Sequence, residues 1–145
     1  MDLAEMQKRG EIAKVEPDMK VANRLLESSE EWIAAAEDSR KAGHAEAALA
    51  LAYNAMLNAG RALLAAKGFR TSSETHHKTV VAFCAAVIPK DAMALVTSFN
   101  RYRIRRHDVV YGEVEGESVS DGEAGAAIGK ARELLSAIRK ACGAQ

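Results

Sequence analysis

Apolar residues in this chain recur with the period of an α-helix in several long segments. After Pro17, the positions i, i+3, i+4 and i+7 are repeatedly apolar or small, which predicts a helix with one buried face. The residues of this stripe are Ala22, Leu25, Leu26, Ser29, Trp32, Ile33 and Ala36. We expect the helix to end near Gly43, because glycine adopts the positive φ angle that commonly follows the last helical turn.

A second helix is predicted from about Ala45 to Lys67, ending at Gly68. Its segment contains ten alanines and a few larger apolar residues. Alanine has the highest helix propensity, and small side chains let neighbouring helices approach closely. This segment is therefore expected to be the central helix.

Three more features continue the helical pattern. The stretch "TSSETHHKTVVAFCAAVI" predicts a loop followed by a short helix, and Pro89 then opens a further helix at the tolerated first-turn position. Ser120 and Glu123 have the spacing of a capping box at the start of the last helix. Its buried face consists of Ala124, Ala127, Ile128, Ala131, Leu134, Leu135, Ile138 and Ala141.

No segment alternates in the way that would predict a convincing strand. A chain of 145 residues has the size of one domain. We therefore expect an all-α protein, a single-domain up-and-down bundle of four to five helices. Residues 1–17 are predicted to be an N-terminal extension or a short helix, and residues 18–145 to form the bundle.

The charges balance, with 20 basic and 20 acidic residues, so any affinity for an anion must come from local clustering. Cys84 and Cys142 lie in apolar helical patterns and are expected to be free thiols, which suits a reducing compartment. No apolar run has the length of a membrane span, and the N-terminus lacks the apolar core of a signal peptide. We expect a soluble cytoplasmic protein that does not contact a membrane.

Local clustering of charge is strongest in "SFNRYRIRRHDVVYGEVEGE", residues 98–117. On a helix, the stripe that passes through Phe99 continues through Asn100, Arg103, His107 and Tyr111, so an apolar face becomes ionisable. Arg101, Arg105 and Asp108 fall on roughly the opposite face, where Arg101 and Arg105 are expected to be solvated, and Arg106 falls at the edge. The ionisable stripe is explained either by a buried polar network or by an anion site, since arginine forks match phosphate oxygens and histidine titrates near neutrality.

Other candidate sites are weaker. His76 and His77 are adjacent and point about 100° apart on a helix, which makes them a poor metal pair. No Gly-rich phosphate loop is present, so neither a metal nor a cofactor is expected. The acidic segment "GEVEGESVSDGE" is interpreted as a connection between helices, or as a cover that keeps phosphate away from the arginines.

The order of these parts resembles the HEPN superfamily of small helical nucleotide-binding and ribonuclease domains. The resemblance covers about residues 20–141 and is most specific in "AYNAMLNAGRALLAAKG" and in the Arg-rich segment ending in "HDVVYG". It is closest to stand-alone prokaryotic members, many of which are encoded beside a small nucleotidyltransferase. The resemblance implies a helical bundle that is commonly a homodimer.

The resemblance also implies which residues act. Active members cut RNA without a metal, using an arginine and a histidine separated by four to six residues. Here these are Arg101 and His107, although Arg103 shares the face of His107, and both arginines remain catalytic candidates. Either the helix breaks near Arg105, or Arg101 acts across a dimer. The remaining candidates for binding RNA or phosphate are Asn100, Arg105, Arg106 and Tyr111.

Three functions compete. The first is a metal-independent endoribonuclease toxin that binds RNA and is paired with a nucleotidyltransferase-type antitoxin. The second is a non-catalytic dimeric module that binds a nucleotide or a partner, and the third is a structural bundle in which the arginines pair internally. Two departures from the family pattern, Tyr102 after the arginine and Val109 two residues beyond the histidine, bear on catalysis more than on fold.

Overall fold

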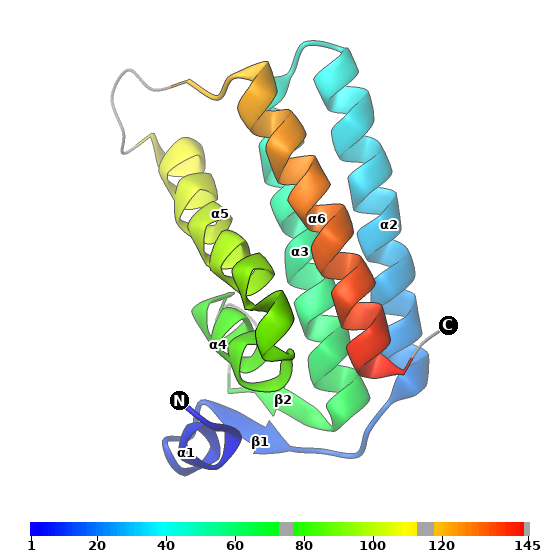
Figure 1. Cartoon of the computed structure of the whole chain (residues 1–145), viewed down its shortest axis with the longest axis vertical. Coiled ribbons are helices and arrows are strands. Elements are labelled where there is room, and N and C mark those ends of the chain that lie inside the picture. Colours follow the sequence, from blue (N-terminus) through cyan, green and yellow to red (C-terminus); the bar gives the residue numbers. More distant parts are fainter. Residues whose placement is uncertain (73–76, 113–117, 144–145) are drawn as a thin grey trace.

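Three long helices lie side by side in the computed structural model, which describes residues 1–72, 77–112 and 118–143 (Figure 1). The elements in chain order are α1 (Leu3–Lys8), β1 (Ile12–Lys14), α2 (Met19–Lys41), α3 (Ala45–Lys67), β2 (Phe69–Thr71), α4 (His77–Val87), a 3₁₀ turn (Lys90–Ala92), α5 (Met93–Tyr111) and α6 (Asp121–Cys142). Helices α2, α3 and α6 contact one another along their lengths. The prediction of an all-α, single-domain bundle is confirmed.

Helix α3 is the centre of the bundle, as its alanine content predicts. It packs against α2 and α6 on one side and against α4 and α5 on the other. Its fully buried side chains include Leu49, Tyr53 and Leu63, and five of its ten alanines are buried. Small residues on every face of α3 permit this number of helix contacts.

The contact between α3 and α4 depends on Gly60. A Cβ atom at this position would lie 2.5 Å from Val80 Cγ1, 3.3 Å from Cys84 Sγ and 3.4 Å from Phe99 Cε2. Any side chain at residue 60 would therefore push α4 and α5 away from α3. This close approach fixes where α4 begins relative to α3.

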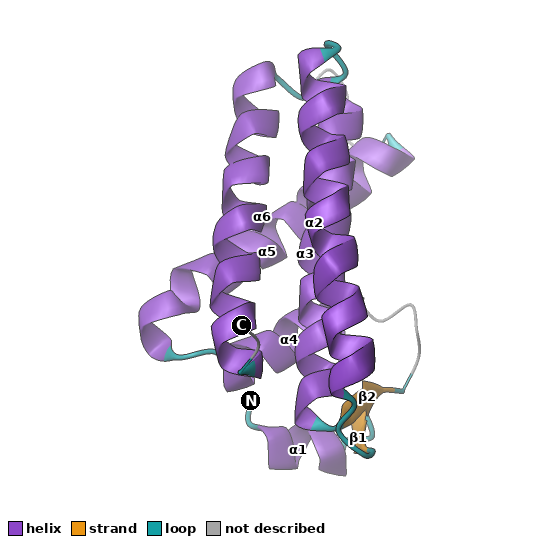
Figure 2. Ribbon diagram, turned by 90° about the vertical axis from the view of Figure 1, so that its right-hand side faces the viewer, coloured by secondary structure: helices purple, strands orange, loops and turns teal. Residues whose placement is uncertain are grey.

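A small sheet near the N-terminus was not predicted (Figure 2). Strands β1 and β2 are antiparallel, and Ile12 pairs with Thr71. Each strand has only three residues, too few for an alternating pattern to stand out in the sequence. Gly68, which has a φ angle of 80°, ends α3 and turns the chain directly into β2.

Most predicted helix ends are confirmed. Helix α3 has the predicted bounds, and the Ser120 Oγ accepts a hydrogen bond of 3.0 Å from the Glu123 amide, as in a capping box. The helix opened by Pro89 differs from the prediction, because a 3₁₀ turn comes first and α5 begins at Met93. Residues 113–117 of the acidic segment, and also His76, lie outside the described residues, so the covering role suggested for that segment stays a prediction.

Candidate functional site at helix α5

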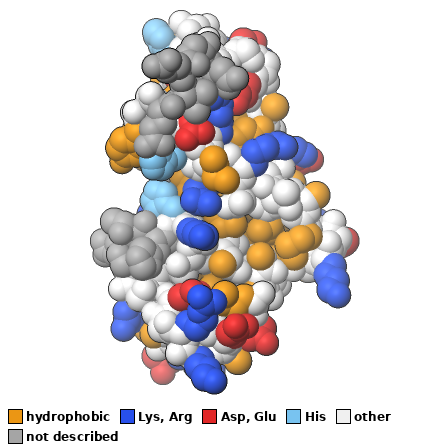
Figure 3. Space-filling model, turned by 90° about the vertical axis from the view of Figure 1, so that its left-hand side faces the viewer, with side chains coloured by type: hydrophobic (Ala, Val, Ile, Leu, Met, Phe, Trp, Pro, Cys, Tyr) orange, Lys and Arg blue, Asp and Glu red, His pale blue; other side chains and the backbone are white. Residues whose placement is uncertain are grey.

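Helix α5 is continuous from Met93 to Tyr111, so the break considered near Arg105 does not occur. Its outer face, defined here as Arg101, Ile104, His107 and Tyr111, is exposed. Ile104 and Tyr111 are 48% and 66% exposed, which is unusual for apolar side chains of this size. Figure 3 shows histidine, Lys/Arg and apolar side chains gathered on the side of the molecule that carries α5.

The predicted orientation of this helix was wrong by part of a turn. The sequence placed His107 and Tyr111 on the stripe that faces the bundle, but both are exposed. The buried stripe instead runs through Phe99 and Tyr102, which are 0% and 5% exposed, and continues to the half-buried Arg106. A tyrosine ring buries more apolar area than an asparagine, which explains why the helix turns Tyr102 inward and leaves Asn100 at the margin.

The two catalytic candidates on the outer face contact aromatic rings. The rings of His107 and Tyr111 have their centroids 4.7 Å apart, and the Arg101 guanidinium lies 5.2 Å from the centre of the Tyr102 ring. Arg101 and His107 are six residues apart on a continuous helix, which separates their directions by about 120°. They flank Ile104 and do not converge on one point within the chain.

Arg105 was predicted to be solvated, and this was wrong. Its side chain is 17% exposed, and its Nε and one terminal nitrogen donate hydrogen bonds of 2.8 and 3.0 Å to the carboxylate of Glu123. This bidentate pair joins α5 to α6 and occupies the guanidinium fork. The Glu123 amide thus donates to the Ser120 cap of α6, while the Glu123 side chain holds α5.

The inner side of α5 contributes to a second group of residues, which we call the arginine cluster: Tyr53, Arg61, His77, Arg103 and Arg106. The Tyr53 hydroxyl lies 3.2 Å from His77 Nδ1, and the Arg106 guanidinium carbon lies 6.0 Å from the centre of the Tyr53 ring. Arg103 donates a hydrogen bond of 3.0 Å from its Nε to Asn100 Oδ1. The cluster brings together residues from α3, α4 and α5.

Electrostatics within the arginine cluster favour a neutral imidazole and a neutral phenol. Burial lowers the pKa of His77, and the positive charges of Arg61, Arg106 and Arg103 lower it further. Burial raises the pKa of Tyr53 to about 12, against the opposite influence of the same three arginines. The Tyr53 hydroxyl therefore keeps its proton near neutral pH.

Two arginines of the cluster, Arg103 and Arg106, form no ion pair with a carboxylate in the ranges 1–72, 77–112 and 118–143. The Nε of Arg106 is buried and makes no hydrogen bond. An unsatisfied buried donor is costly, and in native proteins it often marks a site that an external group completes.

The sequence did not identify Tyr53, Arg61 or His77 as site residues. A signal existed for Arg61, because it is the one charged residue of α3 between Glu46 and Lys67 and it interrupts an apolar segment. His77, which the sequence singled out only as a poor metal ligand beside His76, is the first residue of α4. Its contact with Tyr53, 24 residues earlier, depends on the approach of α4 to α3 and has no counterpart in a local pattern.

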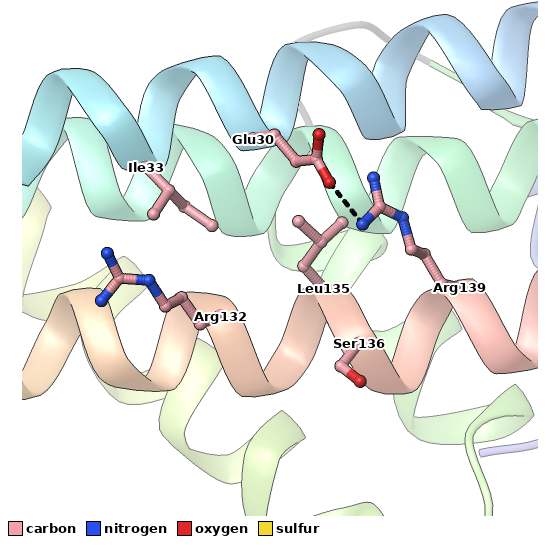
Figure 4. Close-up of a pocket in the computed structure, with 6 residues that line it drawn as sticks. All are labelled: Glu30, Ile33, Arg132, Leu135, Ser136 and Arg139. Carbon is pink, nitrogen blue, oxygen red and sulfur yellow. Dashed lines mark ion pairs between the residues drawn. The ribbon is translucent and has the colours of Figure 1, made fainter. Parts of the chain in front are cut away.

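A groove of about 270 Å³ lies on the other side of the bundle, between α2 and α6 (Figure 4). It is lined by Glu30, Ile33, Arg132, Leu135, Ser136 and Arg139. Its two arginines are paired, Arg139 with Glu30 and Arg132 with Glu37. This groove offers no cation that lacks a carboxylate, so it is a weaker candidate for an anion site.

The described residues contain no group of histidine, cysteine, aspartate or glutamate side chains arranged to hold a metal ion. No helix among them is long and apolar enough to cross a membrane. Both cysteines are free thiols, and burial raises the pKa of Cys84 to about 12.

Comparison with known proteins gives one informative match. No curated protein matches the chain. The family model of the HEPN domain matches residues 22–141, which include the whole of α3, α4 and α5 and nearly all of α2 and α6. HEPN domains are in general ribonuclease or nucleotide-binding modules, and they commonly dimerise. Because the match spans most of the sequence, the chain belongs to the HEPN domain family.

Proposed function

We propose that two copies of this protein pack through the outer face of α5 and form a metal-independent endoribonuclease site from Arg101 of one protomer and His107 of the other. The observation that carries the proposal is the geometry of α5. The helix is continuous, so Arg101 and His107 of one chain diverge by about 120° around it. A second protomer can bring the two residue types together.

In such a dimer, Ile104 would lie on the two-fold axis. It is the midpoint between Arg101 and His107, three residues from each. If two antiparallel copies of α5 cross at Ile104, Arg101 of one protomer lies level with the partner's His107, about 4.5 Å along the helix from the axis. The same arrangement covers Ile104, whose side chain is 48% exposed in the single chain. An isologous interface of this kind generates two equivalent sites.

The chemistry of the pair suits RNA cleavage. The guanidinium of Arg101 neutralises the scissile phosphate, and the imidazole of His107 accepts the proton of the ribose 2′-hydroxyl. The 2′-oxygen then bonds to phosphorus, the bond from phosphorus to the 5′-oxygen breaks, and the leaving 5′-oxygen takes a proton from water. The products are a 2′,3′-cyclic phosphate and a 5′-hydroxyl end.

Aromatic residues beside the pair supply a surface for single-stranded RNA. Tyr111 stands 66% exposed with its ring against that of His107, where a base can stack on it. In the cell, we propose that this activity makes the protein a toxin that a nucleotidyltransferase-type antitoxin holds in check. Co-expression with such a partner is expected to relieve growth arrest caused by the wild-type protein and to change nothing for His107→Ala.

Cleavage of single-stranded RNA in the presence of EDTA tests the proposal. We expect His107→Ala and Arg101→Ala each to reduce the rate by about 10²–10⁴-fold, the usual contribution of a positioned acid–base group. His44→Ala is the matched control, because His44 is also exposed but lies at the start of α3. Equal cleavage by wild type and His107→Ala excludes this site.

The dimer is tested separately by light scattering at micromolar concentration. We expect a mass about twice the 15.6 kDa of the chain. Ile104→Asp places two carboxylates on the two-fold axis and is expected to give a monomer that does not cleave RNA. A monomeric wild-type protein that still cuts RNA contradicts the shared site.

The second candidate, a non-catalytic HEPN module that binds a nucleotide or partner, is favoured by the arginine cluster. Arg103 and Arg106, which pair with no carboxylate in the described part of the chain, are suited to hold an anion whether or not a bond is cut. A wild-type protein that binds RNA but yields no cyclic phosphate end establishes this candidate in place of the first.

A further inference from the structure

We infer that Glu123 is a positioning residue of the ribonuclease site: by pairing with Arg105, it fixes the direction in which the C-terminal half of α5 presents His107. The inference rests on the proposed function, because it concerns how the same site is held in place. Glu123 lies in the first turn of α6, outside the pair of residues to which the chemistry is assigned.

The C-terminal half of α5, residues 103–111, has few apolar contacts that hold it to the bundle. The buried residues of α5 end at Tyr102. Beyond it, Val109 packs against the core. The other apolar side chains of this half are exposed, namely Ile104, Val110 and Tyr111. Burial of apolar area therefore fixes the first half of the helix more firmly than the half that carries His107.

The pair between Arg105 and Glu123 fastens this half of α5 to α6. Both oxygens of the Glu123 carboxylate accept hydrogen bonds from Arg105, at 2.8 and 3.0 Å. Two parallel hydrogen bonds fix the orientation of the partners as well as their distance. Both side chains are half-buried, which reduces the screening that weakens a fully exposed pair. The pair is therefore suited to set the rotation of this part of the helix.

The direction of His107 follows from that rotation. Successive residues of an α-helix are turned by about 100°, so His107, two residues after Arg105, points about 160° away from it around the axis. With Arg105 fastened to α6, His107 is turned away from α6, and its side chain is exposed. A rotation of residues 103–111 would move His107 off the outer face that the partner protomer covers in the proposed dimer.

The Glu123 side chain has a different partner from the one usual in a capping box. In that motif, the side chain of the third helical residue commonly returns to the amide of the cap residue. Here the Glu123 amide donates to Ser120 Oγ as expected, but both carboxylate oxygens accept from Arg105 of α5. The residue that takes part in the cap of α6 therefore also ties α6 to α5.

Asp121 provides a matched control within the same turn of α6. It accepts hydrogen bonds of 3.0 and 3.1 Å from Arg40, so it forms the same kind of two-bond pair, but with α2 and not with α5. Asp121→Ala and Glu123→Ala each remove one acidic residue from the first turn of α6. A difference between the two variants therefore reports on the connection to α5.

Amide hydrogen exchange followed by NMR tests this connection without RNA, at a concentration where light scattering gives the wild type and both variants the same mass. We expect Glu123→Ala to speed exchange in residues 103–111 about tenfold or more and to leave residues 93–102 unchanged. Asp121→Ala is expected to leave both halves of α5 unchanged. Equal exchange of residues 103–111 in the three proteins, or faster exchange throughout the Glu123→Ala chain, contradicts the inference.

Cleavage of single-stranded RNA in EDTA tests the consequence for His107. We expect Glu123→Ala to lower kcat about 10- to 100-fold, because a small displacement of a catalytic group is costly, and to change KM by less than about twofold. Arg105→Ala is expected to have the same effect, and the double variant no larger one, since both substitutions remove one interaction. If the two losses multiply in the double variant, Arg105 and Glu123 do not act as a pair.

The outcomes separate this role from the proposed ribonuclease. If the wild type cuts RNA and Glu123→Ala cuts it equally fast, Glu123 does not position His107. If the wild type never cuts RNA, the ribonuclease proposal fails. Hydrogen exchange then decides by itself whether Glu123 holds residues 103–111 in place.

Discussion

Arginines on the two sides of α3 differ in whether a carboxylate of the described residues pairs with them. Between α2 and α6, Arg40 and Arg132 each pair with a carboxylate from the neighbouring helix. Arg139 pairs in the same way with Glu30 (Figure 4). Toward α4 and α5, Arg103 and Arg106 have no such partner among the described residues. A surface ion pair explains why an arginine is present without invoking any ligand. The second group has no such explanation, and this difference directs attention to α5.

The largest expected effect on the fold comes from closing the gap between α3 and α4. Gly60→Ala places a methyl group 2.5 Å from Val80 Cγ1, so α4 must shift and the unfolding free energy is expected to fall by about 1–3 kcal/mol. Gly129→Ala is the matched control on α6, because its Cβ meets nothing within 4 Å, and it is expected to stabilise by about 0.5–1 kcal/mol. Urea denaturation of both variants checks the two signs. Equal effects at the two positions contradict the close approach.

A smaller effect is expected from giving an arginine of α5 a carboxylate partner, as the arginines between α2 and α6 have. Asn100→Asp is nearly isosteric and gives Arg103 a carboxylate in place of the amide oxygen that it already contacts at 3.0 Å. We expect this internal ion pair to compete with an external anion and to weaken phosphate binding by about tenfold. Isothermal titration with inorganic phosphate checks the result, and unchanged affinity shows that Arg103 does not contribute to the site.

The α4–α5 side of α3 is also expected to make the stability of the protein depend on pH, through His77. Because the pKa of His77 is lower in the folded protein than its ordinary value of 6.5, the unfolded chain takes up a proton first as the pH falls. Wild-type stability is therefore fully present above about pH 6.5 and decreases as the pH drops below it. His77→Gln removes this part of the decrease, which thermal unfolding between pH 5 and 8 detects. If the wild type and the variant lose stability in parallel, the half-buried His77 is not held neutral by the fold.

The smallest effect is predicted for the paired arginines. Arg132 is 53% exposed, and exposed ion pairs contribute little because water and salt screen them. Arg132→Gln is expected to change the unfolding free energy by less than about 1 kcal/mol. Denaturant unfolding at low and high salt checks this, and a loss of several kcal/mol shows that the pairs hold the helices together.

The fold was predictable because each long helix carries its own signals. Alanine content, the Gly68 end and the Ser120 cap act within a few residues, so α3 and α6 could be located from sequence. The site was predictable only in part. The choice of α5 came from its local clustering of arginines, that of Arg101 and His107 from the resemblance to the HEPN superfamily, and that of Arg103 from the face it shares with His107. The rotation of α5, in contrast, depends on the burial of Tyr102 and on the pairing of Arg105 with Glu123. Tyr53 and His77 meet only through the packing of α4 on α3, which no spacing rule encodes.

A subunit-mixing experiment tests the central claim, that Arg101 and His107 act across a dimer, most directly. Arg101→Ala and His107→Ala are each expected to be inactive on RNA in EDTA. After the two variants are mixed in equal amounts and exchange subunits, half of the dimers carry one variant of each kind. Such a dimer retains one intact site, which unites Arg101 of the His107→Ala protomer with the partner's His107, so about one quarter of wild-type activity is expected. If cleavage stays absent after exchange while both variants remain dimeric, the two residues do not form a site across the two-fold axis.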